Sequence, residues 1–528
     1  MTPSRLRVTL AAALIALIAM LGPASATEAI AQDLVVALSS EPTSLSPLFL
    51  DVDTGNWKAF NGLVTFDADL GLVPDLAAEL PEVSEDGKTV TVRLRDDVQF
   101  HDGEPLTADD VVFTWQALSD PELASPLFSR FGLDGLISEV TAVDDLTVQF
   151  TLSRLDPAFV EKLYVGIVPE HLLAGEDLAQ SDFNRQPVGT GPYRYVETVP
   201  GERIVFEANP DYFGGAPTIQ RVVFTFLPDE NARVAALLDG SIDVARLNPR
   251  LAETFRDNPA FQVIEIPSAS IEQMSLPNTN PVLAEAPVRR AIAMGIDRQA
   301  LLEAIQLGVG QVANSPIVSG QWAYDPSVTI PFDPEQAAQL LDEAGWVPGD
   351  DGIREKDGQR LAFTIMHLPT LTQHRDMGLA MRSDLAEIGI DVTVEAVDTP
   401  AYLDRLATDP WLHGIGTPYD PDTELWARYH SSLADDGDPG TNRAGMRNPD
   451  VDAALEAGRA TTDRDQRRDS YTDLQHALAE DGSYLHLLER AITVVVPADV
   501  EGIEVQLQGS PHGFPRGIAW SLERWTRT

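Results

Sequence analysis

The sequence predicts a mixed α/β protein with two α/β lobes and an additional strand-rich segment. The chain has 528 residues, more than one hydrophobic core usually organises. Segments with the two-residue alternation of strands are interleaved with segments of helical periodicity. Strand-like segments are commoner in the first half, whereas residues 280–490 alternate helices with strands. We therefore expect two lobes with a ligand-binding cleft between them.

Strand-like alternation is clearest in the first half of the chain. In residues 89–100, TVTVRLRDDVQF, valine and leucine occupy one face while threonine and arginine occupy the other. Residues 144–152, DDLTVQFTL, repeat the alternation. Residues 203–210 and 221–229 are shorter β-rich segments that are ended by proline. These four segments indicate strands with one buried face.

Helix boundaries are marked by capping residues. Thr107 is a candidate N-cap for the segment ADDVVFTWQAL, whose acidic first turn suits the helix dipole. Asp333 precedes a proline and begins a second helix that Gly345 ends. Residues 287–306 and 377–390 are amphipathic, and the latter lead directly into the strand-like DVTVEAV. The helices thus fall between strands, as the fold class requires.

The charge of the chain excludes one class of partner. With 37 basic and 82 acidic side chains, the formal net charge is −45. Such a field repels DNA, RNA and anionic lipid, so we expect no nucleic-acid partner and no membrane insertion. The acidity is spread along the chain, which is typical of a solvated surface.

The N-terminus resembles a secretory signal peptide. Arg5 and Arg7 precede an apolar stretch over residues 8–21, and Ala29-Ile30-Ala31 fits the small-x-small cleavage rule. A membrane anchor would need about 20 apolar residues. The chain has no cysteine, hence no disulfide, no thiolate metal site and no acylated cysteine. These features predict a free periplasmic protein, exported by a cleaved signal peptide and not a lipoprotein.

Three stretches resemble a known family. Residues 87–118, residues 188–217, and VRRAIAMGIDRQALLEAI with the later FDPEQAAQLLDEAGW are similar to signatures of the bacterial extracellular solute-binding proteins of family 5, which serve peptide and nickel ABC importers. The resemblance covers essentially the whole mature chain. It implies a type II periplasmic binding protein fold with the extra subdomain of the cluster C type. It also implies a receptor without catalytic activity that closes two lobes over a solute.

The resemblance also suggests domain boundaries. We expect the signal peptide at 1–31, lobe I at 33–75, 190–270 and 495–528, an inserted subdomain of lobe I at 76–189, and lobe II at 271–494.

The residues of these three stretches are expected to support the fold rather than to contact the ligand. Asp102-Gly103 is a turn pair between a strand and the helix after Thr107. Gly189 and Gly191 permit a tight backbone path. A phosphate-binding loop would be followed by the start of a helix, and none is expected here, so these glycines do not indicate a phosphate site. The solute should instead contact irregular loops between the lobes.

The segment His413 to His430, HGIGTPYDPDTELWARYH, stands where this family places its main ligand-lining loop. The resemblance aligns Thr417 with an acidic residue that pairs with the free amine of the peptide in peptide-binding members. A hydroxyl cannot neutralise an ammonium group, which argues against an ordinary peptide. Asp420 either replaces that acid or, followed by Pro421, only starts a turn.

The same loop resembles the nickel-binding branch of the family, which also carries Pro-Tyr-Asp-Pro; residues 353–365 share this likeness. In that branch, aromatic and arginine side chains hold a chelated metal and a histidine ligates the ion. Tyr419 matches the branch's tyrosine, Ile415 replaces its tryptophan, and His430 lies near its histidine. Arg130 is only a loose match for its first-lobe arginines. A peptide-like compound, an opine and a metal chelate all remain open as solutes.

Further candidates come from both lobes. Asn56 and Trp57 lie where the family's first lobe faces the cleft, and Arg443 could pair with a carboxylate. The aromatic residues of the loop serve either as cleft walls or as core packing. We expect the following ligand-binding residues: Asn56, Trp57, His413, Ile415, Thr417, Tyr419, Asp420, Trp426, His430 and Arg443.

Direct metal ligation and catalysis are not expected. The nine histidines are scattered without a His-x-x-x-His pair, and we predict no metal ligand and no cofactor. A secreted hydrolase is the alternative, but Gly-x-Ser-x-Gly, His-Glu-x-x-His and cysteine are all missing. A periplasmic chaperone or sensor partner with the same cleft is another alternative. The expected partners are a small solute and the transmembrane subunits of an ABC permease, and the protein is expected to be a monomer.

Overall fold

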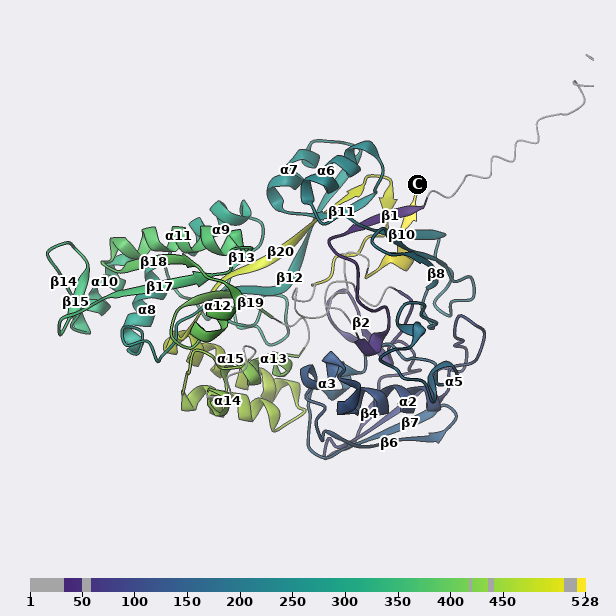
Figure 1. Ribbon diagram of the computed structural model, residues 1–528. Helices are drawn as coiled ribbons and strands as arrows, with labels where there is room; N and C mark the ends of the chain where they lie inside the picture. Colours follow the sequence, from purple (N-terminus) through teal and green to yellow (C-terminus); the bar gives the residue numbers. More distant parts are fainter. Residues whose placement is uncertain (1–32, 50–57, 417–419, 435–440, 508–519) are drawn as a thin grey trace, which may run out of the picture.

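The computed structural model describes residues 33–49, 58–416, 420–434, 441–507 and 520–528. Two regions lie side by side and are joined by two long strands, β12 (Phe261–Ser275) and β20 (Tyr484–Pro497) (Figure 1). We call the described residues of 33–260 and 498–528 the N-terminal region, and those of 276–483 the C-terminal region. The expected signal peptide lies outside the described residues.

The strands of the N-terminal region are β1 (Leu34–Leu38), β2 (Val64–Phe66), β3 (Leu72–Pro74), β4 (Glu82–Val83), β5 (Thr89–Arg93), β6 (Ile137–Asp144), β7 (Thr147–Leu152), β8 (Tyr193–Val199), β9 (Arg203–Ala208), β10 (Arg221–Phe226), β11 (Val244–Leu247), β21 (Val500–Glu501) and β22 (Thr526–Arg527). Its helices are η1 (Pro47–Phe49), α2 (Ala108–Ser119), η2 (Pro121–Leu123), α3 (Pro126–Arg130), α4 (Phe159–Lys162), α5 (Glu170–Leu173), η3 (Asp182–Asn184), α6 (Glu230–Asp239), α7 (Pro249–Arg256) and η5 (Leu522–Arg524).

The strands of the C-terminal region are β13 (Gln311–Val312), β14 (Val347–Pro348), β15 (Arg354–Lys356), β16 (Gln359–Arg360), β17 (Ala362–His367), β18 (Asp391–Ala396) and β19 (Trp411–Ile415). Its helices are α8 (Ala286–Gly295), α9 (Arg298–Gln306), α10 (Pro334–Glu343), α11 (Thr372–Glu387), α12 (Thr399–Arg405), α13 (Asp422–Tyr429), η4 (Ser431–Leu433), α14 (Pro449–Arg459) and α15 (Arg464–Asp481).

One mixed sheet of eleven strands runs through both regions. Its order is β18-β17-β19-β12-β20-β11-β1-β10-β9-β8, and β13 pairs with β20 off this path. β12 and β20 are antiparallel, with register shifts between Pro267 and Ile271 and between Glu272 and Gln273. The irregular stretch therefore lies in the two strands that connect the regions.

A separate antiparallel sheet of four strands, β4-β5-β7-β6, forms the lower part of the N-terminal region in Figure 1. Val90 and Val92 of β5 are buried, as is Phe150 of β7, which confirms the predicted alternation. This sheet is the strand-rich segment that the sequence predicts, and the mixed α/β fold class is confirmed.

The predicted helix ends are confirmed, with one difference. The carboxylate of Asp110 accepts a hydrogen bond from the N-cap Thr107 N–H at 2.9 Å, and Asp333 accepts from the Gln336 N–H at 2.9 Å. However, residues 287–306 form two helices, because Asp297 begins a new helix by accepting from the Ala300 N–H. A continuous amphipathic pattern conceals such a break.

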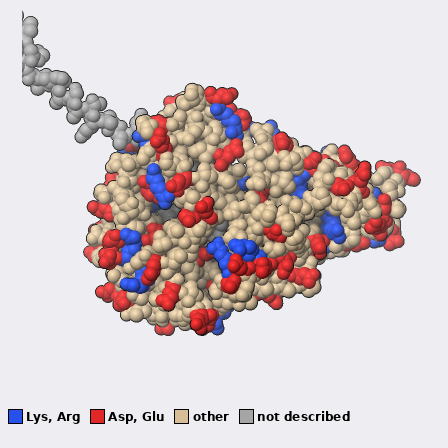
Figure 2. Space-filling model, turned by 180° about the vertical axis from the view of Figure 1, so that it is seen from behind, with Lys and Arg blue, Asp and Glu red and all other residues tan. Residues whose placement is uncertain are grey.

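Each region has hydrophobic cores of its own. The largest cluster of the N-terminal region includes Trp115, Phe150 and Trp525, and those of the C-terminal region include Trp346 and Tyr471. The clusters centred on the two regions share no residue. On the face shown in Figure 2, acidic side chains are spread widely among fewer basic ones, which accords with the negative net charge.

Glycines of the second family signature permit a close backbone approach. A Cβ at Gly189 would lie 2.0 Å from the Ala59 carbonyl oxygen, and one at Gly191 would lie 2.2 Å from that of Lys58. The Gly191 N–H donates to the Ala59 oxygen at 2.9 Å. This signature therefore holds the chain next to residues 58–60, as its predicted scaffold role requires.

Candidate functional site

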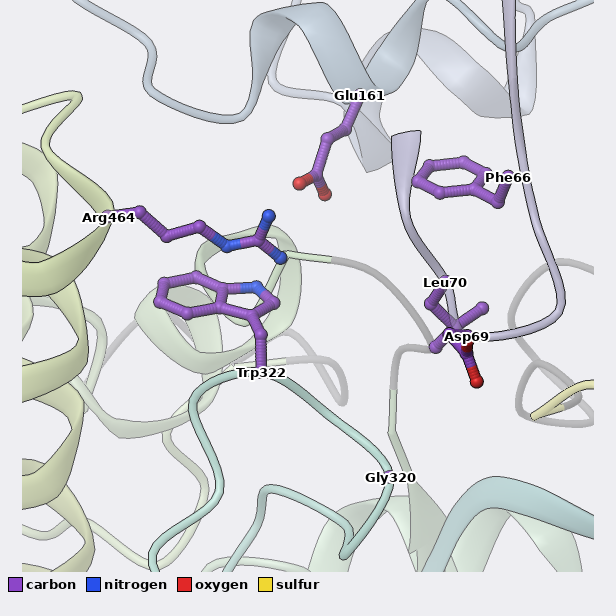
Figure 3. Close-up of a pocket in the computed structure, with 7 residues that line it drawn as sticks. All are labelled: Phe66, Asp69, Leu70, Glu161, Gly320, Trp322 and Arg464. Atoms are coloured by element: carbon purple, nitrogen blue, oxygen red, sulfur yellow. The ribbon is translucent and has the colours of Figure 1, made fainter. Parts of the chain in front are cut away.

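A pocket lies at the boundary between the two regions (Figure 3). The enclosed space between its walls is only about 20 Å³, and the hollow measures about 270 Å³ when the open solvent at its mouth is included. The N-terminal region contributes the β2–β3 turn and α4, while the C-terminal region contributes the loop before α10 and the start of α15. The lining residues are Phe66, Asp69, Leu70, Glu161, Gly320, Trp322 and Arg464.

One wall of the pocket, which we call the basic wall, consists of the Trp322 ring and the arginines of α15 that lie near it. The Arg464 guanidinium carbon lies 4.7 Å from the centre of the Trp322 ring, a cation–π contact that Figure 3 shows. Arg467, one turn later, forms a buried bidentate ion pair with Asp420, with N–O distances of 2.5 and 2.6 Å. Arg468 binds Asp465 at 2.8 Å. Among the described residues, Arg464 forms no ion pair.

Glu161 forms the acidic wall from the opposite region. Its carboxylate points toward Arg464 and Trp322 (Figure 3). The Oε2 atom is shielded from solvent and has no hydrogen-bond partner, while the backbone N–H of Asp420 binds the carboxylate. Burial, and then the charge of Asp420, raise the pKa of Glu161 to about 8, although Arg464 and Arg467 oppose the shift.

The residue after Glu161 anchors helix α4. The Lys162 ammonium donates to the Phe131 carbonyl at 2.8 Å and to the Asp156 carboxylate at 2.5 Å. Both Lys162 and Asp156 are nearly excluded from solvent. This internal ion pair fixes the short helix and therefore the direction of the Glu161 side chain.

A pocket between two separately cored regions is what a solute-capturing protein needs. Residues 71–436 match the family described as bacterial extracellular solute-binding proteins, family 5. The chain belongs to this family. Its members are periplasmic or extracellular receptors rather than enzymes, and they work with ABC permease subunits. The resemblance seen in the sequence is thereby confirmed.

Individual members of the family cover nearly the whole chain. Protein XP55 of Streptomyces lividans is 39% identical over 484 residues, 92% of this chain and 88% of its own. The oligopeptide-binding protein AppA of Bacillus subtilis is 28% identical over 513 residues, 93% and 91% of the two chains. The structure of NikZ from Campylobacter jejuni in complex with Ni(L-His) is 29% identical, with a TM-score of 0.80 over 94% of this chain and 99% of NikZ.

The expected loop from His413 to His430 contains the end of β19 and the helix α13, and its first two candidates lie on β19, held by neighbouring strands. The Nε2 atom of His413 lies 3.0 Å from both the Gln273 amide and the Ser275 hydroxyl, and its ring stacks on Trp411 at 3.8 Å. Ile415 is buried in the C-terminal core. The described contacts of both residues are with the protein's own strands.

The next candidates lie just before and along α13 in the C-terminal region. Asp420 is occupied by Arg467, as described above. Trp426 stacks on His430 at 4.0 Å, and the Arg459 guanidinium lies 3.8 Å from the centre of the same indole ring. This stacking joins α13 to the end of α14 within the C-terminal region.

The remaining candidates divide into two groups. Arg443 is half-buried, and its Nε atom is shielded without a hydrogen-bond partner. Asn56, Trp57, Thr417 and Tyr419 lie outside the described residues. Among the described side chains, no group of three or more His, Asp or Glu residues could hold a metal ion. Within the same ranges, no helix is long and apolar enough to cross a membrane.

The pocket also contains residues that sequence reasoning missed. Glu161 lies on a four-residue helix, and Trp322 is an isolated tryptophan in a loop. Arg464 lies within the charged segment DRDQRRD, which resembles an ordinary solvated helix face. Only the tertiary fold brings these three together, because they are far apart in the chain.

Proposed function

We propose that this protein captures a small solute in the boundary pocket and delivers it to the membrane subunits of an ABC importer. The observation that carries the proposal is that the opposing walls, Glu161 on one side and Trp322 with Arg464 on the other, come from regions with separate cores. A solute that touches both walls favours the arrangement in which they are close.

The mechanism we infer is closure. The two regions act as lobes, with limits near 33–75, 190–270 and 495–528 for lobe I, 76–189 for its inserted subdomain and 271–494 for lobe II. The strands β12 and β20 act as the hinge, where the register shifts accommodate bending. Solute binding must favour the closed state enough to shift the population, and the closed form then docks on the permease.

The solute class we infer is a peptide-like compound, an opine or a metal chelate. The solved complexes of relatives support this range, since AppA of Bacillus subtilis was crystallised with a nonapeptide and NikZ with Ni(L-His). We also infer export to the periplasm by cleavage of residues 1–31, without a lipid anchor, and action as a monomer without enzymatic activity.

Small-angle scattering tests the proposal. The mature protein should compact when it binds a member of a panel of amino acids, peptides, opines and metal chelates. A solute at a hundred times its dissociation constant should add about 2.7 kcal/mol of stability, which thermal unfolding detects. Absence of compaction with the whole panel and with any solute that co-purifies would contradict the receptor role.

A further inference from the structure

We propose that a buried ion pair between Glu272 and Arg490 controls the hinge by holding the two regions at the angle at which the walls of the boundary pocket face each other. We call this pair the hinge clamp. The inference rests on the proposed closure and names two residues that govern it. Neither is among the described residues that line the pocket, so both are positioning residues that act through the strands.

The two hinge strands lose their pairing over a short stretch. Pairing stops after Pro267 of β12 and resumes at Ile271, and residues 268–270 between them lie opposite Arg490 alone. On one side of this bulge β20 pairs with β11 of the N-terminal region, and on the other side β12 pairs with β19 of the C-terminal region (Figure 1). Arg490 therefore lies where the strands pass from one region to the other, at a bulge that permits bending.

The hinge clamp links this bulge to the C-terminal half of the strands. Glu272 pairs directly with Leu488, and Arg490 is two residues further along β20, so the three side chains share a face. The Arg490 guanidinium forms an ion pair with the Glu272 carboxylate. The side chain of Glu272 is 0% exposed and that of Arg490 is 24% exposed. A carboxylate buried in this way depends on its partner, because removal of the partner leaves an uncompensated charge.

The groups that face the pair strengthen this dependence. His374 at the start of α11 donates from Nε2 to Glu272 at 3.2 Å, but burial lowers its pKa to about 4, so it is neutral at pH 7. Burial, and then the charge of Arg246 on β11, lower the pKa of Arg490 to about 10, and the guanidinium stays charged. Arg490 is thus attracted by an acid of the C-terminal half and repelled by a cation of the N-terminal region.

This arrangement opposes opening of the hinge. A change of angle at the bulge moves Arg490 relative to Glu272, and the buried acid then loses its counter-ion. The hinge clamp therefore favours the arrangement in which the pocket walls approach each other. Since the affinity for a solute increases with the population of the competent arrangement, the clamp should raise affinity without contacting the solute.

The test measures the distance between the two regions with spin labels, which can be placed selectively because the chain has no cysteine. Ala142→Cys on β6 and Ala457→Cys on α14 put labels at exposed positions of the two regions. Glu272→Gln with Arg490→Met, the clamp variant, removes both charges and leaves neither one unpaired. Without solute, its ratio of long to short distances should rise about fivefold or more over that of the labelled parent. Arg490→Lys, which keeps the charge, should give an intermediate ratio.

The matched control is a buried ion pair within one region. Arg289 and Asp481 lie 3.3 Å apart, and their side chains are 4% and 13% exposed. Arg289→Met with Asp481→Asn should lower the stability in urea denaturation and leave the distances between the labels unchanged. An equal shift of the distances in the control and clamp variants, or no shift in the clamp variant, would overturn the inference.

Addition of a nickel–L-histidine chelate or dialanine separates this inference from the proposed function. If a probe shortens the distance in the parent, its affinity for the clamp variant should fall by the same factor as the population of short distances. Unchanged affinity despite a shifted population would overturn the inference. If neither these probes nor the panel above shortens the distance in the parent, the receptor function falls, and the comparison without solute still decides whether the clamp exists.

Discussion

Two acid–base couples lie next to each other at the boundary and differ in one respect. Asp420 and Arg467 both belong to the C-terminal region and are joined by a buried bidentate ion pair. Glu161 and Arg464 belong to different regions, line the pocket, and form no ion pair with each other. The first couple fixes the shape of one wall, whereas the second leaves its charges available to a guest. We therefore expect the couple within one region to support the fold, and the couple across the boundary to affect solute binding.

Breaking the first couple should produce the largest loss of stability. Asp420→Asn removes the partner of Arg467, whose side chain is only 5% exposed, and leaves a buried charge unpaired. Burial alone would lower the pKa of Arg467, but Asp420 raises it, so the guanidinium stays charged. We expect a loss of about 3–5 kcal/mol in the free energy of unfolding, measured by urea denaturation. Asp465→Asn, at an exposed ion pair, is the control, and equal losses in the two variants would contradict the argument.

Stability should be less sensitive to a change at Gly191, where the chain passes close to residues 58–60 of the N-terminal region. In Gly191→Ala the new Cβ would lie 2.2 Å from the Lys58 carbonyl oxygen, so the backbone must move. We expect a loss of about 1–3 kcal/mol by the same measurement. Gly414→Ala is a matched control, because its nearest neighbour would be the Ser270 hydroxyl at 3.6 Å. Comparable losses at both positions would show that the close approach is not what requires glycine.

The sequence predicted what local chemistry determines. Thr107 and Asp333 mark helix starts because a capping residue acts within its own turn, and the valines of β5 show their buried face by alternation alone. The two-helix break at Asp297 was missed because both helices bury the same kind of face. The boundary pocket was not predictable in this way: Glu161, Trp322 and Arg464 meet only through the fold.

The candidate loop illustrates the same limit. Asp420 is a candidate because it could replace the acid that is missing at Thr417, but in the structure its carboxylate is occupied by Arg467. Nothing near Asp420 in the sequence indicates that an arginine on a later helix occupies it. Trp426 presents a similar case, since both Arg459 and His430 stack on its ring. The presence of an aromatic residue in this segment does not reveal which surface its ring covers.

The second couple should appear in the pH dependence of stability. The pKa of Glu161 is raised from its ordinary 4.5 to about 8, mainly by burial and then by Asp420, so the folded state holds this proton more tightly than the unfolded chain. The resulting stabilisation is complete below pH 4.5 and is lost as the pH rises toward 8. The difference in unfolding free energy between the wild type and Glu161→Gln should therefore decrease from pH 5 to pH 8. A difference that is constant over this range would contradict the raised pKa of Glu161. The control Glu139→Gln, at an exposed position, should show the same pH dependence of unfolding free energy as the wild type.

The smallest stability effects should come from the two exposed arginines that flank the first couple on α15. Arg464→Gln loses one cation–π contact, and Arg468→Gln loses an exposed ion pair and a hydrogen bond to the Trp322 carbonyl. Each change should cost about 1 kcal/mol or less in urea denaturation. Binding should nevertheless separate them: only Arg464 lines the pocket, so only its replacement should weaken capture of the solute in calorimetry. If the Arg468 variant lost affinity equally, the basic wall would act as a diffuse field, and the distinction between paired and unpaired charges would fail.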